Sequence, residues 1–175
     1  DSTSSNDMRI TKIGKVIRKF KLDEISQLYN VLVGDMSLVG PRPNVKRETD
    51  LYTLKEKELL TIKPGITDFS SIVFSDEGEI LANSCDPDLD YNQLIRPWKS
   101  RLGIFYINNM SLILDIQLIV CTVIAVISKK NVLRFLSKKL YDMGADQNLV
   151  KVSSRNSTLK PTSPPGSKKI VTSRY

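Results

Sequence analysis

The sequence predicts a small α/β (α+β) domain in which helices surround a short sheet, with further amphipathic helices toward the C-terminus. Three observations support this prediction. The chain has 175 residues, which suits one domain with a modest core. Apolar residues recur at helical spacing in several segments, and a run of β-branched and aromatic residues lies between them. Apolar residues make up 41% and charged residues 26%, a balance typical of a folded protein.

The charged residues, the lack of histidine and the two cysteines restrict the partners and the catalytic chemistry open to this chain. The formal net charge of +7 favours an anionic partner, which is a nucleic acid, a phosphorylated substrate or an acidic membrane surface. The chain has no histidine, which excludes Ser-His-Asp and Cys-His nucleophile systems and imidazole metal ligands. Cys85 and Cys121 lie far apart, with neither zinc-ligand spacing nor a disulfide framework, so we expect a reducing compartment. Catalysis must therefore use carboxylates, Lys, Arg and a bound hard cation.

The N-terminal part is polar and then basic. Residues 1–8 predict a flexible leader without a signal peptide. Because the chain starts at Asp1 rather than Met, we expect a fragment with a segment missing upstream. Residues 9–21 predict a basic amphipathic helix, since cations alternate with apolar residues at helical spacing.

A second helix is predicted to begin at Asp23, a favourable N-cap residue. Its apolar face follows an i, i+3, i+4, i+7 pattern, formed by Ile25, Leu28, Tyr29 and Leu32. Gly34 and Asp35 end this helix, and Asp35 is expected to order the turn. Residues 36–39 are short and extended, and residues 40–43 (GPRP) form a stiff non-helical segment because both prolines restrict the backbone.

The middle of the chain alternates in character. Residues 46–62 are charged with spaced leucines and predict a helix, and Lys63-Pro64-Gly65 predicts a turn. Residues 67–74 predict a strand because they are rich in β-branched and aromatic residues. Residues 76–79 are expected to turn the chain toward a second short apolar stretch at 80–82. Residues 86–91 predict an acidic loop, and residues 93–107 a helix around Pro97.

The C-terminal third predicts helices at a membrane surface. Ser111 is an N-cap residue, and residues 112–127 are almost entirely apolar apart from Asp115 and Gln117. This run is shorter than the roughly 20 apolar residues of a membrane-spanning helix, so we interpret it as a core or interfacial helix. Lysines and arginines alternate with leucines in the residues that follow, which suits an anionic leaflet. We expect interfacial helices at about 111–143 and a disordered Ser/Pro/Lys-rich tail at 146–175.

The segment from Lys21 to Pro43 contains the candidate chemistry. Asp23 and Glu24 are adjacent carboxylates at a predicted helix N-terminus, which attracts anions and keeps a carboxylate ionised. An ionised Asp can attack phosphorus, and a carboxylate pair can bind Mg²⁺ together with phosphate oxygens. Arg42 suits bidentate recognition of phosphate. The simpler interpretation is that the pair only caps the helix, worth about 0.5–2 kcal/mol.

The exact residue order in three segments is more specific than these general features. The pattern LDE-x-x-QL-x-NVL-x-GDMSLVGPRP, followed by KPGIT at 63–67 and YINNMSLILDIQLI at 106–119, closely resembles the bacterial sugar transferase family, the monotopic polyprenyl-phosphate phosphoglycosyl transferases. Residues 9–14 and Arg18 also match the segment that precedes the Asp-Glu pair in that family. The resemblance extends over about residues 6–128.

The resemblance implies a two-step transfer of a sugar-1-phosphate. Asp23 matches the family's nucleophile and would attack the β-phosphate of a UDP-sugar, expelling UMP. A polyprenyl (undecaprenyl) phosphate would then take up the phosphosugar. Glu24 matches the second member of the pair, a Mg²⁺ ligand or positioning group. Arg18 and Arg42 match residues that hold phosphate or nucleotide; Lys63 is a further candidate, and an ordinary solvated turn lysine is an equally good interpretation.

The resemblance also implies location and boundaries. Residues 9–145 would form the catalytic domain of an enzyme that starts capsule or exopolysaccharide synthesis. It would be monotopic, on the cytoplasmic face of the bacterial inner membrane. Family members normally begin with a hydrophobic re-entrant helix, and this sequence has none upstream of the match.

Two other interpretations remain open. The chain could be a truncated, catalytically silent remnant or a partner-binding subunit that keeps the fold. It could also be a basic nucleic-acid-binding protein, but we see no zinc finger or aromatic-basic stacking motif and do not expect nucleic acid as a partner. Salt-sensitive DNA binding without turnover of UDP-sugars would support that last interpretation.

Overall fold

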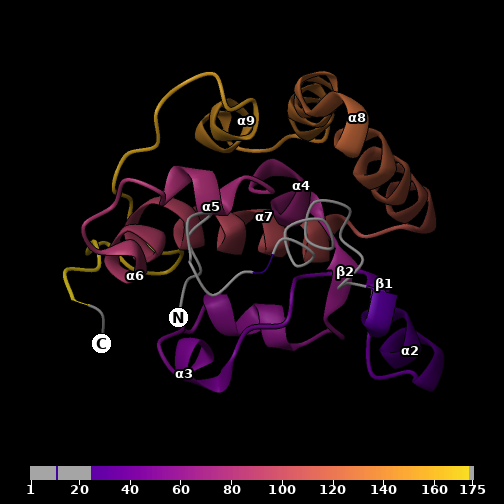
Figure 1. Ribbon diagram of the computed structural model, residues 1–175, viewed down its shortest axis with the longest axis horizontal. Coiled ribbons are helices and arrows are strands. Elements are labelled where there is room, and N and C mark those ends of the chain that lie inside the picture. Colours follow the sequence, from indigo (N-terminus) through magenta and orange to yellow (C-terminus); the bar gives the residue numbers. More distant parts are fainter. Residues whose placement is uncertain (1–10, 12–24, 174–175) are drawn as a thin grey trace.

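The computed structural model describes residue 11 and residues 25–173. Helix α7 (Arg96–Asn109) runs through the middle, and α4 (Phe69–Val73) packs against both α7 and α8 (Leu112–Asp142). Helices α8 and α9 (Gln147–Ser153) cover one side of the molecule, and α3 (Lys46–Thr49) lies on the opposite side (Figure 1). The molecule is therefore a mostly helical small domain with a two-stranded sheet, which confirms the predicted fold class.

The sheet lies beside α2 (Ile25–Val33) at one edge of the domain (Figure 1). Strands β1 (Ser37–Val39) and β2 (Gly65–Thr67) are parallel, with Ser37 opposite Gly65 and Val39 opposite Thr67. Backbone hydrogen bonds continue past β1, because Gly40 N donates to Thr67 O at 2.9 Å and Gly65 N donates to Pro41 O at 2.9 Å. These bonds hold the start of the GPRP segment against both ends of β2.

Two glycines allow this close approach. A Cβ added to Gly65 would lie 2.1 Å from Gly40 N, and a Cβ added to Gly40 would lie 2.9 Å from the carbonyl oxygen of Lys63. Both neighbouring atoms belong to the backbone and have no side-chain freedom to move away. The glycines of GPRP and KPGIT are thus required by one contact between two segments that are distant in sequence.

The strand predicted at 67–74 is wrong. The extended part ends at Thr67, and Phe69–Val73 form helix α4. Asp68 caps this helix by accepting a hydrogen bond from Ser71 N at 2.7 Å, and Ser71 Oγ accepts from Asp68 N at 2.8 Å. This reciprocal capping overrides the β-propensity of the residues that follow.

Several other helices and turns of the structure also differ in their bounds from the predicted ones. The single helix expected at 46–62 is two short pieces, α3 and the 3₁₀ helix η2 (Glu56–Leu60). The turn expected at 76–79 is mostly α5 (Glu77–Ile80), and the acidic loop expected at 86–91 contains α6 (Pro87–Asp90). The π-helical turn η3 (Tyr91–Ile95) then leads into α7, whose first turn contains Pro97.

The apolar run at 112–127 and the basic run after it form one 31-residue helix, α8, with a kink at Ser128. By length and composition this helix is long enough to cross a membrane. One side packs into the core through Leu114, Leu118 and Cys121. Asp115 accepts a hydrogen bond from Tyr106 Oη at 2.6 Å, so the one acid of the apolar run is paired with a core residue.

The C-terminal residues differ from the disordered tail expected at 146–175. Asp146 accepts hydrogen bonds from the first amides of α9, and Leu149 of α9 is buried in the core. The following residues lie against η2, η3 and α7 and make specific hydrogen bonds there. Ser, Pro and Lys content predicts disorder only where a chain finds no surface to pack on, and this tail has one.

Replacing Gly65 by Ala should destabilise the fold strongly, because the new methyl group meets backbone rather than a movable side chain. We expect a loss of about 3 kcal/mol or more in the free energy of unfolding, at the upper end of overpacking effects. Gly103→Ala is the milder comparison. Its Cβ would come closest to a movable side-chain atom, Leu59 Cδ2 at 2.6 Å, with Pro41 in ordinary contact at 3.6 Å, and alanine favours the helix by about 0.8–1 kcal/mol. Urea unfolding followed by circular dichroism measures both, and equal losses would contradict the proposed role of the Gly40–Gly65 contact.

Candidate functional site

A cavity of about 710 Å³ lies between the GPRP segment, η2, the start of α4 and the start of α7. Its size is in the range of pockets that bind small molecules and cofactors. Side chains from distant parts of the chain line it, among them Arg42, Asn44, Glu48, Tyr52, Asp68, Ser70, Glu77, Tyr91, Arg96, Lys99 and Ser100. The lining is mainly polar with both signs of charge, which suits a polar, phosphorylated ligand better than a hydrophobic one.

Arg42 reaches this cavity because its backbone is held on both sides. Pro41 is buried and accepts the hydrogen bond from Gly65 N, and Pro43 follows Arg42 directly. The two prolines fix their φ angles, so the segment has little freedom. Arg42 is exposed at the lining of the cavity, where a guanidinium can meet an anionic ligand.

Lys63 lies elsewhere. Its Nζ donates a hydrogen bond to the carbonyl oxygen of Gly34 at 2.6 Å, and the residue is exposed and does not line the cavity. Gly34 has a φ of +90° and ends α2, so Lys63 satisfies a carbonyl at a helix C-terminus. This contact supports a role for Lys63 in joining α2 to β2.

The remaining predicted site residues, Arg18, Asp23 and Glu24, lie outside the described residues. The description of this part resumes at Ile25, so the two carboxylates immediately precede α2 in the chain. From there the chain runs through α2 and β1 directly to Arg42.

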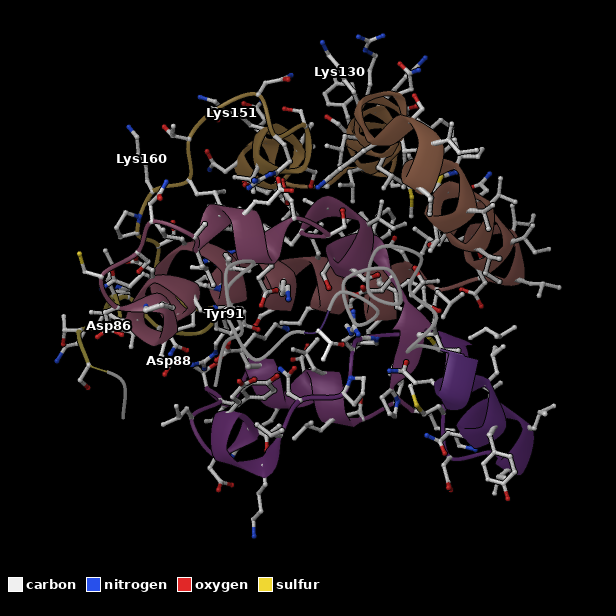
Figure 2. The ribbon with its side chains drawn as sticks, viewed as in Figure 1. Asp86, Asp88, Tyr91, Lys130, Lys151 and Lys160 are labelled. Carbon is white, nitrogen blue, oxygen red and sulfur yellow. The ribbon has the colours of Figure 1, made fainter. Side chains whose placement is uncertain are left out.

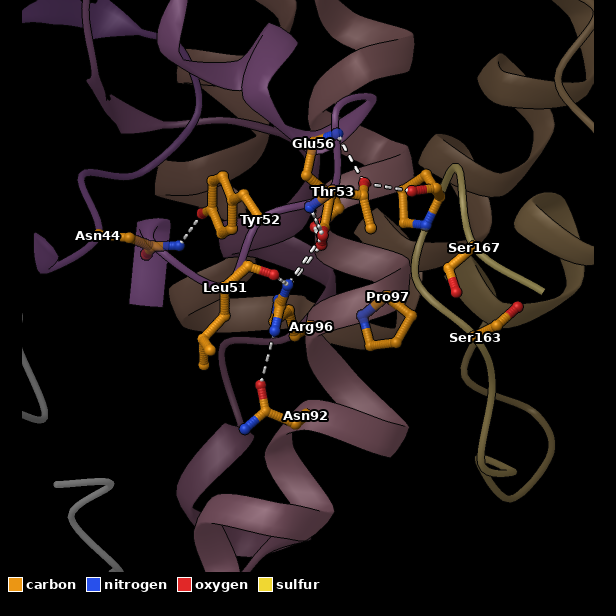
Figure 3. Close-up of polar contacts among 12 residues, drawn as sticks. Asn44, Leu51, Tyr52, Thr53, Glu56, Asn92, Arg96, Pro97, Ser163 and Ser167 are labelled. Atoms are coloured by element: carbon orange, nitrogen blue, oxygen red, sulfur yellow. Dashed lines mark hydrogen bonds and ion pairs between the residues drawn. The ribbon is translucent and has the colours of Figure 1, made fainter. Parts of the chain in front are cut away.

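A buried ion pair at the cavity wall was not predicted. Glu56 is fully buried and Arg96 nearly so, and Arg96 Nη2 lies 2.8 Å from Glu56 Oε2. Arg96 also donates to Glu56 Oε1, Asn92 Oδ1 and the carbonyl oxygen of Leu51, and its guanidinium lies 5.4 Å from the centre of the Tyr52 ring (Figure 3). Ser100 Oγ donates to Glu56 at 2.8 Å. With its donors used inside the protein, Arg96 shapes the wall of the cavity.

Another part of the wall combines an ion pair with an aromatic ring. Lys99 Nζ pairs with Glu77 and lies 5.3 Å from the centre of the Tyr91 ring. Burial, followed by the negative charge of Glu77, raises the pKa of Tyr91 well above its ordinary value. The Tyr91 hydroxyl is therefore protonated at neutral pH and is suited to hydrogen bonding rather than base catalysis.

Asp68 is a fully buried carboxylate in the cavity lining. Burial raises its pKa above 3.8, although hydrogen bonds from Ser71 N and the hydroxyls of Ser70 and Ser71 oppose that shift. Ser70 Oγ lies within 2.9 Å of both carboxylate oxygens. Sequence reasoning missed this residue because residues 67–74 were interpreted as a strand. The Asp-x-x-Ser capping pattern at 68–71 was the available signal.

Among residue 11 and residues 25–173, no group of three His, Cys, Asp or Glu side chains is placed to hold a metal ion. Two acids of the cavity lining have partners, since Glu77 pairs with Lys99 and Asp68 accepts hydrogen bonds from Ser70 and Ser71.

Asp68→Asn should change how stability depends on pH. Above pH 3.8 the unfolded chain loses the Asp68 proton while the folded protein still holds it, because burial raises the folded pKa. Stability therefore falls as pH rises from 3.8 through the folded pKa, and the neutral amide removes this fall. The stability of the variant relative to the original should rise over that window and then level off.

Urea unfolding at a series of pH values measures this difference. Asp146→Asn is the matched control, because Asp146 caps α9 at an exposed position and undergoes the same chemical change without burial. A constant stability difference between the Asp68→Asn and original proteins across this pH window would contradict a raised folded-state pKa for Asp68.

Comparison with known proteins places the chain in a family. The family model described as bacterial sugar transferase matches residues 1–129. The chain is 42% identical over 117 residues to the galactosyl transferase CpsE of Streptococcus agalactiae, covering 67% of this chain and 23% of that protein. It is 36% identical over 132 residues to the UDP-glucose:undecaprenyl-phosphate glucose-1-phosphate transferase of Xanthomonas campestris, covering 73% and 25%.

A third relative is the UDP-N-acetylgalactosamine-undecaprenyl-phosphate N-acetylgalactosaminephosphotransferase of Aeromonas hydrophila. It is 35% identical over 124 residues, covering 67% of this chain and 25% of that protein. The chain thus spans about a quarter of the length of these three relatives. The match of residues 1–129 includes the GPRP segment, η2, α4 and α7, which together build the cavity. The chain therefore belongs to the bacterial sugar transferase family.

Proposed function

We propose that this chain transfers a sugar-1-phosphate from a UDP-sugar to undecaprenyl phosphate, the first step in building a cell-surface glycan such as a capsule or exopolysaccharide. The observation that carries the proposal is Arg42, held by the Gly40–Gly65 contact at a polar cavity large enough for a nucleotide sugar. Family membership and the activities named for two of the relatives support the same reaction class.

The proposed reaction has two displacements. A carboxylate oxygen of Asp23 attacks the phosphorus that bears the sugar, and the bond from that phosphorus to the bridging oxygen breaks, so that UMP leaves with the bond electrons. The acceptor's phosphate oxygen then attacks the aspartyl phosphosugar, which frees the Asp23 carboxylate and forms a polyprenyl diphosphate sugar. Phosphoryl transfer of this kind needs mainly positioning and charge stabilisation, and it needs no histidine.

Arg42 and Arg18 would stabilise the phosphate charges of donor and acceptor. Glu24 would hold Mg²⁺ together with phosphate oxygens, which fits the preference of this ion for one or two carboxylates and several non-protein oxygens. When bound, the ion neutralises charge on the diphosphate. Loss of adduct formation in EDTA, and its recovery when Mg²⁺ is added, would support this assignment. Full adduct formation in EDTA would contradict it.

The Asp23 nucleophile predicts a covalent intermediate. Incubation with a panel of UDP-sugars and Mg²⁺ should add the mass of one phosphosugar to the intact protein and release UMP. Asp23→Asn should abolish the adduct, because the neutral amide is a far weaker nucleophile. Intact-protein mass spectrometry measures both.

Two comparisons sharpen this test. Arg42→Ala should slow adduct formation about 10²-fold or more while leaving the same product mass, since it removes charge stabilisation but not the nucleophile. Lys46→Ala, an exposed cation in α3 that does not line the cavity, is the matched control. If no UDP-sugar labels the original protein, a silent remnant or partner-binding subunit becomes the better description.

We also propose that α8 lies on the cytoplasmic leaflet of the bacterial inner membrane. An apolar stripe at helical spacing faces away from the core, consisting of Ile113, Ile116, Val120, Val123 and Ile127, with side chains 49–89% exposed. Contiguous apolar surface of this kind is unusual on soluble proteins. Exposed basic residues continue the same side of the molecule, and Figure 2 shows Lys130, Lys151 and Lys160 pointing outward. This arrangement fits acyl chains beside anionic headgroups.

Ile127→Asp should weaken binding to phosphatidylglycerol-containing vesicles about tenfold or more, because burying an isoleucine side chain contributes about 1.5–3 kcal/mol. Leu54→Asp is the matched control, since Leu54 is 87% exposed against 89% for Ile127 and lies between α3 and η2, on the other side of the domain. Vesicle co-sedimentation measures both, and equal effects of the two variants would rule out an interfacial role for this stripe.

A further inference from the structure

The C-terminal strap, defined as residues 159–171, lies across the surface formed by η2, η3 and α7. Thr162 N donates to the carbonyl oxygen of Gln93 at 3.0 Å, and Gln93 Nε2 donates to Val171 O at 2.6 Å. Arg101 Nη2 donates to Ser163 O at 2.9 Å. The strap lies beyond residues 1–129, the segment that the family model matches.

Thr53 connects the strap to the buried ion pair. Its Oγ1 donates to the carbonyl oxygen of Pro165 at 2.5 Å (Figure 3). Thr53 Oγ1 also accepts a hydrogen bond from Glu56 N at 3.1 Å. Thr53 N donates in turn to Glu56 Oε2 at 3.0 Å. Thr53 thus contacts a strap carbonyl and the Glu56 amide through its side chain, and the Glu56 carboxylate through its backbone N–H.

The connection continues into the cavity. Glu56 fixes the guanidinium of Arg96, which holds the carbonyl oxygen of Leu51 at 2.9 Å and lies against the ring of Tyr52. Both Arg96 and Tyr52 line the cavity. Hydrogen bonds that share partners in a buried, low-dielectric setting strengthen one another, so loss of the outermost bond weakens the innermost one.

We propose that the strap is a positioning element for the cavity: through Thr53 it fixes the Glu56–Arg96 pair and, with it, the Tyr52 wall against which the donor nucleotide binds. The positioning of the wall stands on the contacts described above, and only the effect on nucleotide binding rests on the proposed function. Thr53 is a positioning residue, because it acts through Glu56 and Arg96.

Gly166 offers a way to detach the strap without touching the cavity. It has a φ of +81°, and an added Cβ would lie 2.8 Å from Lys55 Cβ. Gly144 has nearly the same φ, +80°, with nothing within 4 Å of an added Cβ. Gly166→Val and Gly144→Val therefore share the backbone strain of a branched residue at positive φ, and only the first pushes the strap away from η2.

The experiment compares these two variants with a chain that ends at Thr158 and lacks the strap. Amide hydrogen exchange at Thr53 and Glu56 should accelerate at least tenfold in Gly166→Val and in the shortened chain, while the amide of core residue Leu118 keeps its protection. Gly144→Val should leave Thr53 and Glu56 unchanged. Emission from Trp98, the single tryptophan, should shift as well, because its ring stacks with the Arg101 guanidinium that holds the strap.

Binding of UMP, measured by calorimetry, tests the functional consequence. The dissociation constant should rise at least threefold in Gly166→Val, in the shortened chain and in Thr53→Val. Thr53→Ser keeps the hydroxyl and should bind UMP as the original does. Thr61→Val is the matched control, because Thr61 lies at the end of η2 and donates only to Glu58 O, away from the strap.

Three results have distinct meanings. Unchanged exchange at Thr53 and Glu56 in the shortened chain overturns the strap proposal, whatever happens to UMP. Faster exchange with unchanged UMP binding overturns its role in positioning the nucleotide wall. If the original protein binds no UMP, the proposed donor site fails, and the exchange measurements alone decide whether the strap fixes the wall.

Discussion

The contact between Gly40 and Gly65 is the constraint on which the rest of the domain depends. It joins two segments that are far apart in sequence, and it leaves no space for a Cβ on Gly65. One segment continues into Pro41-Arg42-Pro43, and the other into Thr67 and the buried cap of α4. A single backbone approach thereby sets where the cation of the GPRP segment and the wall around Asp68 lie relative to each other.

The buried Glu56–Arg96 pair has a different physical role. Removing two charges from water is costly, and their attraction repays that cost only with good geometry and further hydrogen bonds. Here Ser100, Asn92, Thr53 and the Leu51 carbonyl provide those bonds. Directional bonds of this kind specify one arrangement of the wall, which apolar packing alone would leave less well defined. The strap, which lies beyond the family match, adds further hydrogen bonds that hold this arrangement.

Prediction from sequence succeeded where local pattern decides the outcome. The apolar face of α8, its N-cap at Ser111 and the short extended segment before GPRP all lie where the sequence placed them. It failed at residues 67–74, because β-propensity measures fit to a half-buried surface and reciprocal capping at Asp68 outweighed it. Arg42 was predicted from motif and resemblance, and the structure places it at the cavity lining, while its role in phosphate binding stays a prediction. Lys63 was predicted in the same way, and the structure places its Nζ at the end of α2. The placement of Arg18, Asp23 and Glu24 stays a prediction.

The sequence by itself determined the family resemblance, the helical character of the C-terminal third and the need for glycine and proline around Arg42. These properties depend on residue type and near neighbours along the chain. Only the tertiary structure decided that Glu56 and Arg96 are buried while many other charges stay in water, and that a Ser/Pro/Lys-rich tail is ordered. Burial depends on which distant segments meet: Glu56 is 40 residues from Arg96, and Thr53 is 112 residues from Pro165. No local pattern contains that information.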